Sequence, residues 1–311
     1  MLTPRPVILD CDPGHDDALA ILLALARPEL EVLGITTVAG NSTLENTTRN
    51  ALALLTLLGR TDVPVAAGAD RPLRRTLQTA PHVHGSSGLE GADLPRPAVG
   101  PRPEDAADLM ATIIESSDAP VTLIPTGPLT NIATFGRRYP ELFGKVQHIC
   151  LMGGSIGEGN ITASAEFNIW VDPDAAHEVF TAGVPLTMIG LDVTHEALLT
   201  LDDADRMAAL GRTGRVFADL MRFFARFHIE HYGWQGAPIH DAVAVAHVLG
   251  LGLVETKPYR VDIEVESELT RGRTVVDLHG VSGQAANAEV GLTIDRRSFV
   301  ELLLGAVSAY S

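Results

Sequence analysis

Apolar runs and polar turns alternate along the first two thirds of the chain, which predicts repeated strand and helix units. An apolar run from Val7 enters an acidic turn, and a solidly apolar helix is predicted over 18–26 before Arg27-Pro28 stops it. Residues 31–38 then form a predicted buried strand. The same alternation predicts strands over 63–67, 121–125, 148–152 and 185–191, and helices over 104–116 and 174–182. At least six such repeats indicate an α/β fold with a parallel sheet.

Local signals add detail to this pattern. Ser42 and Glu45 have the spacing of a capping box for the second helix, which Gly59 is expected to end. Residues 70–103 contain prolines, glycines and arginines without a period, and their length predicts a functional loop. Beyond Thr200 the pattern predicts helices over 202–210, 214–232, 240–249 and 298–308, and late strands over 259–265 and 273–278.

No internal repeat, low-complexity tract or linker divides the chain, so one domain is expected over residues 1–311. The predicted fold is an open, mostly parallel, Rossmann-like sheet with helices on both faces and a C-terminal helical and β appendage.

Composition narrows the classes of partner. A formal net charge of −16 and a pI near 5.0 disfavour nucleic acid polymers and anionic membranes, and no apolar run is long enough to span a bilayer. Cys11 and Cys150 each lie in an apolar run, which indicates buried thiols in a reducing compartment. With no charged-then-apolar leader in the sequence, a cytoplasmic protein is expected.

An acidic turn at residues 10–17 is the strongest chemical signal. Asp10, Asp12, Asp16 and Asp17 lie within eight residues after an apolar run. Two carboxylates about 6 Å apart repel by roughly 3 kcal/mol at an effective dielectric constant of about 20, and a hard cation such as Ca²⁺ would offset this repulsion. Aspartates also form turns and helix caps, but one or two are enough for that purpose. An EF-hand loop is excluded by the glycine spacing.

Other polar residues are expected at the same edge of the sheet. Asn41, Thr126, Met152 and the loop 160–168 all follow predicted strands, as the acidic turn does. Because ligands of such sheets bind outside the carboxyl ends of the strands, these side chains should converge on one site. A cation with carboxylate and amide groups suits a polyhydroxylated ligand, and a sugar is the natural candidate.

Six segments, in order, carry a resemblance to a known family: DCDPGHDDALA, VHGSSGLEG, TGPLTNIA, LMGG, NITASAEFNIWVDPDAA and HDAVAVA. Together they resemble the inosine-uridine-preferring nucleoside hydrolases over most of the chain. The resemblance implies Ca²⁺-dependent hydrolysis of the N-glycosidic bond of ribonucleosides to ribose and free base, through an oxocarbenium-like transition state. It also implies a homo-oligomer, either a dimer or a tetramer.

The resemblance further implies roles for individual residues. The Ca²⁺ ligands would be Asp12, Asp17, the backbone carbonyl of Thr126, and Asp241. Asp12 would also be the general base toward a metal-bound water, and His240 would give the departing base a proton or a strong hydrogen bond. The ribose would be held by Asp16, Asn41, Met152, Asn160, Glu166 and Asn168. The base would meet His84, with His82 as a competing position, and His228 and Tyr232.

Two other hypotheses remain open at this stage. Asp10 and Asp12 have the D-x-D spacing of aspartyl-phosphate phosphatases, although the residues that follow them differ from that family. A ribonucleoside-binding protein without catalysis would use the same pocket. The purine or pyrimidine preference and the closure of the 70–103 loop over a ligand are not predicted.

Overall fold

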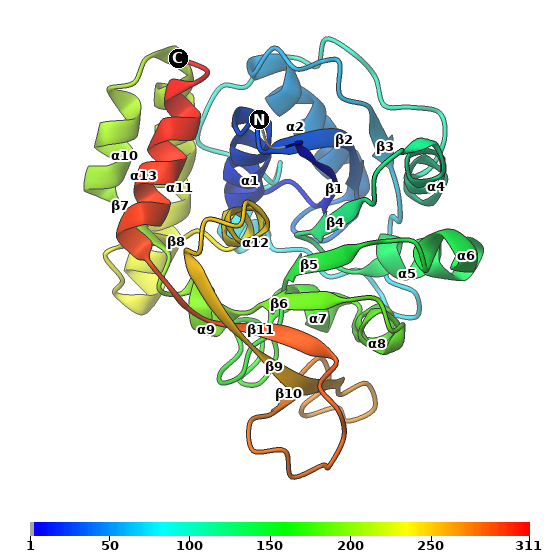
Figure 1. The fold of residues 1–311 in the computed structure, drawn as a ribbon. Coiled ribbons are helices and arrows are strands. Elements are labelled where there is room, and N and C mark those ends of the chain that lie inside the picture. The colour runs from blue at the N-terminus through cyan, green and yellow to red at the C-terminus, as the bar shows by residue number, and fades with distance from the viewer. Residues whose placement is uncertain (1–2) are drawn as a thin grey trace.

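The architecture comes from a computed structural model, which describes residues 3–311. Over that range a nine-stranded sheet has the order β10-β9-β11-β6-β5-β4-β1-β2-β3 (Figure 1). Its strands are β1 Arg5–Cys11, β2 Leu30–Thr37, β3 Val65–Ala67, β4 Thr122–Pro125, β5 His148–Met152, β6 Leu186–Ile189, β9 Val254–Ile263, β10 Thr274–Asp277 and β11 Ala288–Ile294. The mostly parallel sheet predicted from the sequence is confirmed.

The strand order changes direction between β1 and β4. Strand β1 pairs in parallel with both β2 and β4, and Asp10 is in register with Thr36 on one side and Pro125 on the other. The chain therefore leaves β1 and β4 at adjacent points of the same edge. A crevice at such a switch point is where open α/β sheets bind ligands.

Helices cover both faces of the sheet because its central strands are apolar on both sides. In β1, Val7, Leu9 and Cys11 pack into one core cluster and Ile8 into the other, as the two-residue period of a strand requires. The first face carries α1 His15–Ala26, α2 Leu44–Leu57 and α12 Asp241–Val248, and the second carries α4 Ala106–Ser116, α5 Thr130–Arg138, α6 Pro140–Phe143 and α8 Pro173–Thr181.

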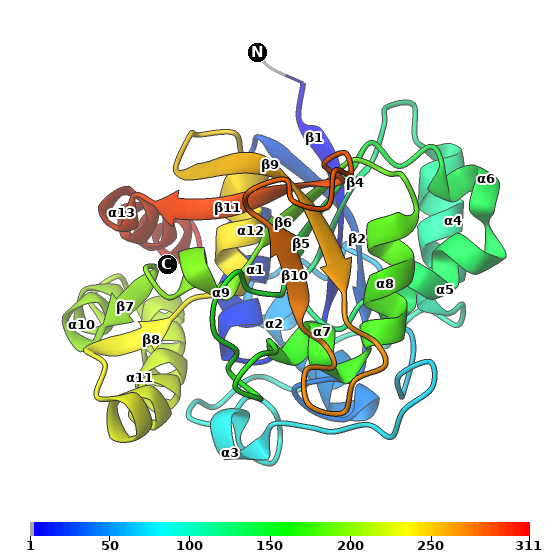
Figure 2. The same cartoon turned by 90° about the horizontal axis from the view of Figure 1, so that it is seen from below.

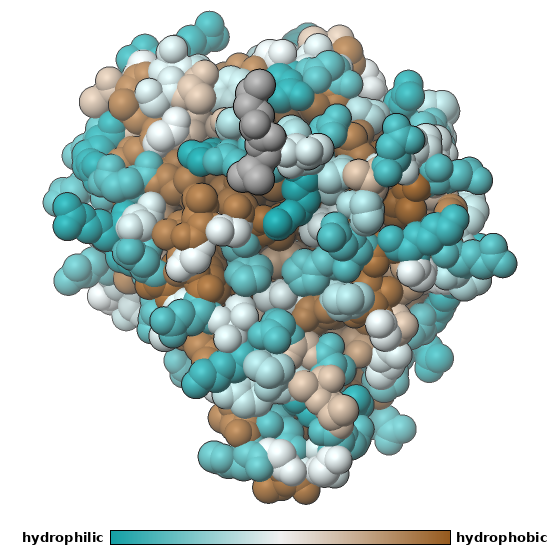
Figure 3. All heavy atoms as spheres, viewed as in Figure 1, coloured by the Kyte–Doolittle hydropathy of each residue, from teal (hydrophilic) through white to brown (hydrophobic). Residues whose placement is uncertain are grey.

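The C-terminal part divides into two regions. Helices α10 Leu201–Ala208, α11 Arg212–Tyr232 and α13 Arg296–Ser308 pack together beside α1 (Figures 1 and 2). The late strands continue the main sheet, because β11 pairs with β6 in parallel and β9 pairs with β11 and β10 in antiparallel fashion. The turns before and after β10 expose two apolar side chains, since Leu269 and Val281 are 85% and 88% exposed. Brown, hydrophobic atoms also lie at the lower end of the molecule in the space-filling view (Figure 3).

Several local details differ from the sequence prediction. Thr43, not Ser42, caps α2 by accepting a hydrogen bond from the backbone of Asn46. The N-cap predicted at Ser42 was therefore one residue too early. The sequence did not predict β11. It also missed short elements around the predicted edge of the sheet: α3 Pro81–His84, α7 Phe167–Val171, α9 Leu191–Thr194, β7 Leu198–Thr200 and β8 Gly236–Pro238. Among residues 3–311, no helix combines the length and apolarity that crossing a membrane demands.

Candidate active site

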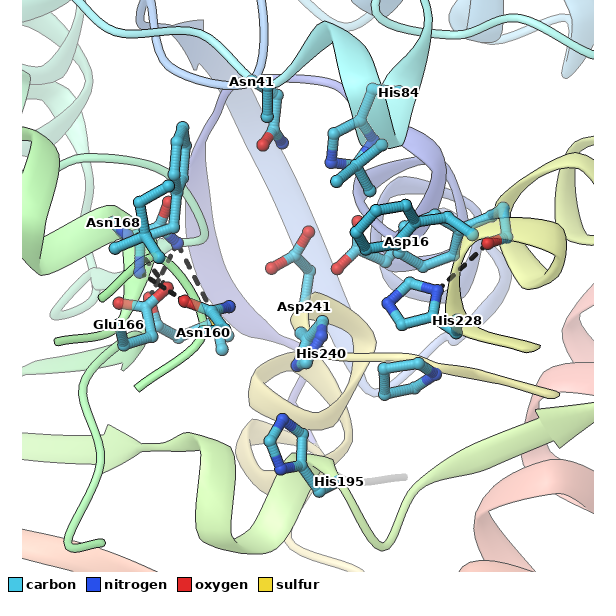
Figure 4. Close-up of a pocket in the computed structure, with 18 of the residues that line it drawn as sticks. Asp16, Asn41, His84, Asn160, Glu166, Asn168, His195, His228, His240 and Asp241 are labelled. Atoms are coloured by element: carbon cyan, nitrogen blue, oxygen red, sulfur yellow. Dashed lines mark hydrogen bonds between the residues drawn. The ribbon is translucent and has the colours of Figure 1, made fainter. Parts of the chain in front are cut away.

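A pocket of about 280 Å³ opens at the carboxyl ends of the central strands. It brings together all ten residues predicted to bind the substrate, together with Thr126, His240 and Asp241. Figure 4 shows Asn160, Glu166 and Asn168 on one side, His84 and His228 on the other, and Asp241 and His240 between them. The predicted convergence on one edge of the sheet is therefore found.

Three carboxylates form a tight cluster at one end of the pocket. Asp16 and Asp17 lie in the first turn of α1, and Asp241 is the first residue of α12. One oxygen from each lies within 4.8 Å of the others, and all three residues are buried. The positive ends of two helix dipoles lessen the electrostatic cost of these charges without removing it. Such an all-oxygen set could hold a metal ion.

Asp12 lies next to this cluster and is completely buried. Its Oδ2 accepts a 2.6 Å hydrogen bond from the backbone of Asn41, while its Oδ1 is enclosed without a partner among residues 3–311. A Cβ at Gly127 would lie only 2.8 Å from that Oδ1, so the wall here requires glycine. Burial, reinforced by the charge of Asp17, raises the pKa of the Asp12 carboxyl well above its usual range. An unpartnered buried carboxylate oxygen beside three further carboxylates fits a hard cation.

Asp10 is held behind the pocket and does not line it. Its Oδ1 accepts hydrogen bonds from Thr36 Oγ1 and Asn131 Nδ2, both at 2.7 Å. Burial raises the pKa of its carboxyl to about 7. The enclosed position disfavours Asp10 as a phosphorylated nucleophile.

Hydrogen bonds fix the orientation of Asp17 and Thr126. Asp17 Oδ1 accepts from Thr126 Oγ1 at 2.8 Å, and its Oδ2 accepts from the backbone of Gly14 at 3.0 Å. The Thr126 carbonyl accepts a 2.8 Å bond from Asn168 Nδ2. The carbonyl predicted as a metal ligand thus also orients a predicted ribose contact.

The side of the pocket formed by the 160–168 segment is built on a helix cap. Glu166 caps α7, and its carboxylate accepts hydrogen bonds from the backbones of Gly154, Asn168 and Ile169. Burial raises the pKa of Glu166 to about 7 despite these donors. Asn160 Oδ1 accepts from the backbone of Phe167 at 2.9 Å, which leaves its amide nitrogen as a donor for a ligand.

The opposite wall consists of aromatic and imidazole rings. Its members are His82, His84, Phe224, Phe227, His228, Tyr232 and Trp234, mostly from α3 and α11. Both predicted histidines of the loop line the pocket, but His84 is buried whereas His82 is exposed. The rings of His82 and Phe227 lie edge to face, with their centroids 5.7 Å apart. Burial lowers the pKa of His228 to about 4, so its ring is neutral near pH 7.

His240 lies between the carboxylates and the aromatic wall. Its Nδ1 is 2.7 Å from the hydroxyl of Thr194, at the end of α9. Burial lowers the pKa of His240 well below its usual range. Its neutral ring can therefore offer an N–H to a departing group as a hydrogen bond.

Sequence reasoning missed two histidines of this region. His195 lines the pocket, 4.9 Å from the ring of Trp234 and 5.8 Å from that of His240. It follows the predicted strand 185–191, so the rule applied to the other strands would have found it. His15, inside the acidic turn, contacts His84, and no local pattern indicates that contact.

Comparisons with known proteins agree with this geometry. The sequence profile of the family described as inosine-uridine preferring nucleoside hydrolase matches residues 7–301. The chain belongs to this family. Like its relatives, this nucleoside hydrolase acts on N-glycosyl bonds, and the resemblance noted in the sequence is confirmed.

Individual relatives cover nearly the whole chain. The pyrimidine-specific ribonucleoside hydrolase RihA of Shewanella sp. strain ANA-3 is 50% identical over 309 residues, or 99% of this chain and 97% of its own length. RihA of Escherichia coli O127:H6 is 48% identical over 98% of this chain and 99% of its own. A solved purine-preferring ribonucleoside hydrolase from Gardnerella vaginalis superposes with a TM-score of 0.92 at 34% identity, over 98% of both chains.

Proposed function

We propose that this nucleoside hydrolase is a Ca²⁺-dependent enzyme that cleaves pyrimidine ribonucleosides to ribose and free base. The observation that carries the proposal is the all-oxygen carboxylate cluster at the base of a pocket with a polar wall facing an aromatic one. Relatives at 48–50% identity named as pyrimidine-specific support the choice of base. The purine-preferring relative is more distant, at 34% identity.

The cation would be held by Asp12, Asp17, the Thr126 carbonyl and Asp241, with Asp16 beside it toward the ribose. Asp16 belongs to the tightest cluster with Asp17 and Asp241, whereas Asp12 contributes the unpartnered Oδ1. Bound Ca²⁺ would supply Lewis acidity toward a water molecule and the ribose hydroxyls.

The residues of the chain divide the reaction between them. Asp12 accepts the proton of the attacking water, since it lies beside the carboxylate cluster and burial makes its carboxylate a stronger base by raising its pKa. Positive charge that develops on the ribose ring is stabilised by the surrounding carboxylates. His240, oriented by Thr194, donates a hydrogen bond to the departing base.

The two walls bind the two halves of the substrate. Asp16, Asn41, Met152 and Asn168 hold the ribose beside the carboxylates, and Asn160 and Glu166 contact its 5′-hydroxyl. His84, His82, His228 and Tyr232 contact the base. In this proposal the chain acts as one domain, in the cytoplasm, within a homo-oligomer. The continuous sheet from β10 to β3 supports the one-domain assignment.

Release of reducing sugar from separate purified ribonucleosides in Ca²⁺-containing buffer tests this proposal. Uridine and cytidine should release ribose faster than inosine, adenosine and guanosine. Faster release from the purines would overturn the base assignment and leave the reaction intact. Binding of uridine without any ribose release over days, by folded protein with Ca²⁺ bound, would instead establish a binding protein.

A further inference from the structure

We propose that Asp192 is a positioning residue that holds the 155–160 segment at the pocket, so that Asn160 meets the 5′-hydroxyl of the ribose in a fixed position. The contact between Asn160 and that hydroxyl rests on the proposed function, whereas the hold of Asp192 on the segment does not. Asp192 would thereby make the enzyme selective for substrates that carry a 5′-hydroxyl.

The 155–160 segment depends on hydrogen bonds for its position. It follows β5 and forms neither helix nor strand, and it ends at Asn160, which lines the pocket. Residues 156–160 are half-buried or exposed, and Ile156 is the one apolar side chain among them. Because so little apolar surface is buried here, polar contacts from other elements must hold the segment.

The start of the segment is anchored from two sides. The backbone N–H of Gly154 donates to the Glu166 carboxylate at 2.9 Å, and that of Ser155 donates to Thr274 Oγ1 at 2.8 Å. Thr274 Oγ1 in turn donates to the Ser155 carbonyl at 2.6 Å. These contacts fix residues 154 and 155 but not the chain beyond them.

Asp192 makes the next two contacts along the segment. Its carboxylate accepts hydrogen bonds from the backbone N–H groups of Ile156, at 2.5 Å to Oδ2, and of Gly157, at 3.1 Å to Oδ1. The backbone N–H groups of residues 159–162 then bond within the loop itself. Among the hydrogen bonds of residues 3–311, those to Asp192 are therefore the last from another element before Asn160.

Asp192 is itself held close to the start of the segment. It lies in the one-turn helix α9, where the backbone N–H of Leu191 donates to the Gly154 carbonyl at 2.9 Å. A Cβ at Gly190 would lie only 2.9 Å from the same carbonyl oxygen, so the two stretches of backbone are in close contact. The position of α9 thus fixes the carboxylate that holds residues 156 and 157.

The same turn of helix also borders the base side of the pocket. Thr194 Oγ1 lies 2.7 Å from His240 Nδ1, and His195, directly after α9, lines the pocket. Figure 4 shows His195 below His240, with Asn160 to one side of them. Asp192 and Thr194 should therefore support different parts of the reaction, the first at the 5′-hydroxyl and the second at the leaving group.

Positioning of Asn160 before the substrate arrives lowers the cost of binding. Its Oδ1 accepts from the backbone of Phe167 at 2.9 Å, and its amide nitrogen is left to donate to the ligand. If the backbone of Asn160 moved, its side chain could not keep both contacts. A segment that Asp192 already holds in place has no ordering cost when the ligand binds.

Hydrogen–deuterium exchange of the ligand-free enzyme tests the hold on the segment. In Asp192→Ala, peptides that span 155–160 should exchange two amides roughly tenfold faster, with a smaller change in Asp192→Asn, which keeps one acceptor oxygen. Asp277→Asn is the matched control, because Asp277 accepts from the backbones of Val281 and Ser282 in the same way, outside the pocket. Unchanged exchange over 155–160 in the folded Asp192 variants would overturn the proposal, whatever reaction the enzyme performs.

Uridine and 5′-deoxyuridine separate positioning from general stability. In Asp192→Ala, kcat/KM for uridine should fall roughly tenfold, mostly through a higher KM, whereas kcat/KM for 5′-deoxyuridine should stay within about threefold of wild type. Asp192→Asn should lose less, and Asp277→Asn should keep the wild-type values. Equal losses with both substrates would mean that Asp192 only supports the fold, and the proposal would fail.

A nitrophenyl riboside distinguishes the two roles of α9. This substrate keeps the 5′-hydroxyl, so Asp192→Ala should impair its cleavage as much as that of uridine, whereas Thr194→Val should spare it. Equal cleavage of uridine and 5′-deoxyuridine by the wild-type enzyme would overturn the contact at the 5′-hydroxyl. If the wild-type enzyme cleaves no ribonucleoside, the proposed function fails, and the exchange of residues 156 and 157 still decides whether Asp192 holds the segment.

Discussion

The two ends of the pocket are built in different ways. At the carboxylate end, Asp12, Asp16 and Asp17 come from one short turn after β1, and only Asp241 comes from a distant segment. At the aromatic end, the rings come from α3, from the second half of α11 and from Trp234 just after it, and the two helices are far apart in the chain. Backbone and side-chain hydrogen bonds fix the first set, whereas ring packing fixes most of the second.

This difference in construction corresponds to the different functions proposed for the two ends. Reaction chemistry needs oxygen atoms held in fixed positions, and strand ends joined to helix N-termini provide them. Base selection needs a wall whose shape can change without disturbing those atoms. Substitutions at the carboxylate end should therefore affect turnover of every nucleoside, while substitutions at the aromatic end should change the ranking of bases.

The largest effect is expected at Asp12. Asp12→Asn keeps the shape of the side chain but removes the proton acceptor, so kcat should fall by roughly 10³-fold for all ribonucleosides. Asp118→Asn, at an exposed turn before β4, is the matched control and should behave as wild type. Steady-state ribose release measures both variants. An Asp12→Asn enzyme within tenfold of wild type would remove Asp12 from the role of general base.

Removal of Ca²⁺ should abolish turnover and make stability depend on pH in a defined direction. Burial raises the pKa values of Asp10 and Asp16 to about 7 from a usual value of 3.8, so the folded protein binds more protons than the unfolded chain between these values. The contribution of these two carboxyls to the free energy of unfolding without metal is therefore greatest below about pH 4 and is lost as the pH rises through about 7.

Burial also raises the pKa values of Asp12, Asp17 and Asp241, the carboxyls proposed as ligands. Ca²⁺ therefore competes with protons for them, and its stabilising effect should grow with pH. Thermal unfolding at about pH 5 and about pH 8, each with chelator and with Ca²⁺, measures this effect. We expect the larger increase in Tm at the higher pH. Equal increases at both values, or restoration of activity by Mg²⁺ alone, would contradict the assignment of a Ca²⁺ site.

A smaller effect is expected at His240, which lies between the two ends. His240→Gln should lower kcat by roughly 10–100-fold with uridine. A nitrophenyl riboside, whose leaving group needs no proton, should be cleaved at nearly the wild-type rate. Thr194→Val should reproduce part of the loss and Thr194→Ser should not, because serine keeps the hydroxyl that contacts His240 Nδ1. Equal losses with both substrates would mean that His240 does not assist the leaving group.

The difference between residues that follow strands and contacts between distant segments also explains which parts of the fold and site the sequence could predict. Alternating apolar strands and helices specify the sheet, and residues that follow strands fall at its carboxyl edge, so the acidic turn, Asn41, Thr126 and Met152 were placed correctly. The His15 contact with Glu90 joins residues 75 positions apart, and no local period encodes it. Strand β11 was missed because its short AEVGLTI sequence has buried and exposed positions without regular alternation.

The smallest effects are expected on the aromatic wall, where they should alter selectivity and not reaction class. His228 Nδ1 lies 3.0 Å from the Phe224 carbonyl, so the neutral ring donates there and turns an acceptor, Nε2, to the pocket. His228→Phe should therefore change the uridine-to-inosine ratio of kcat/KM by roughly three- to tenfold, while Tyr232→Phe, at a residue 45% exposed, should change it less. Inhibition by ribose should be unchanged in both. If these variants weaken ribose binding as much as they change the ratio, the two ends of the pocket are coupled, and selection of the base cannot be separated from binding at the carboxylates.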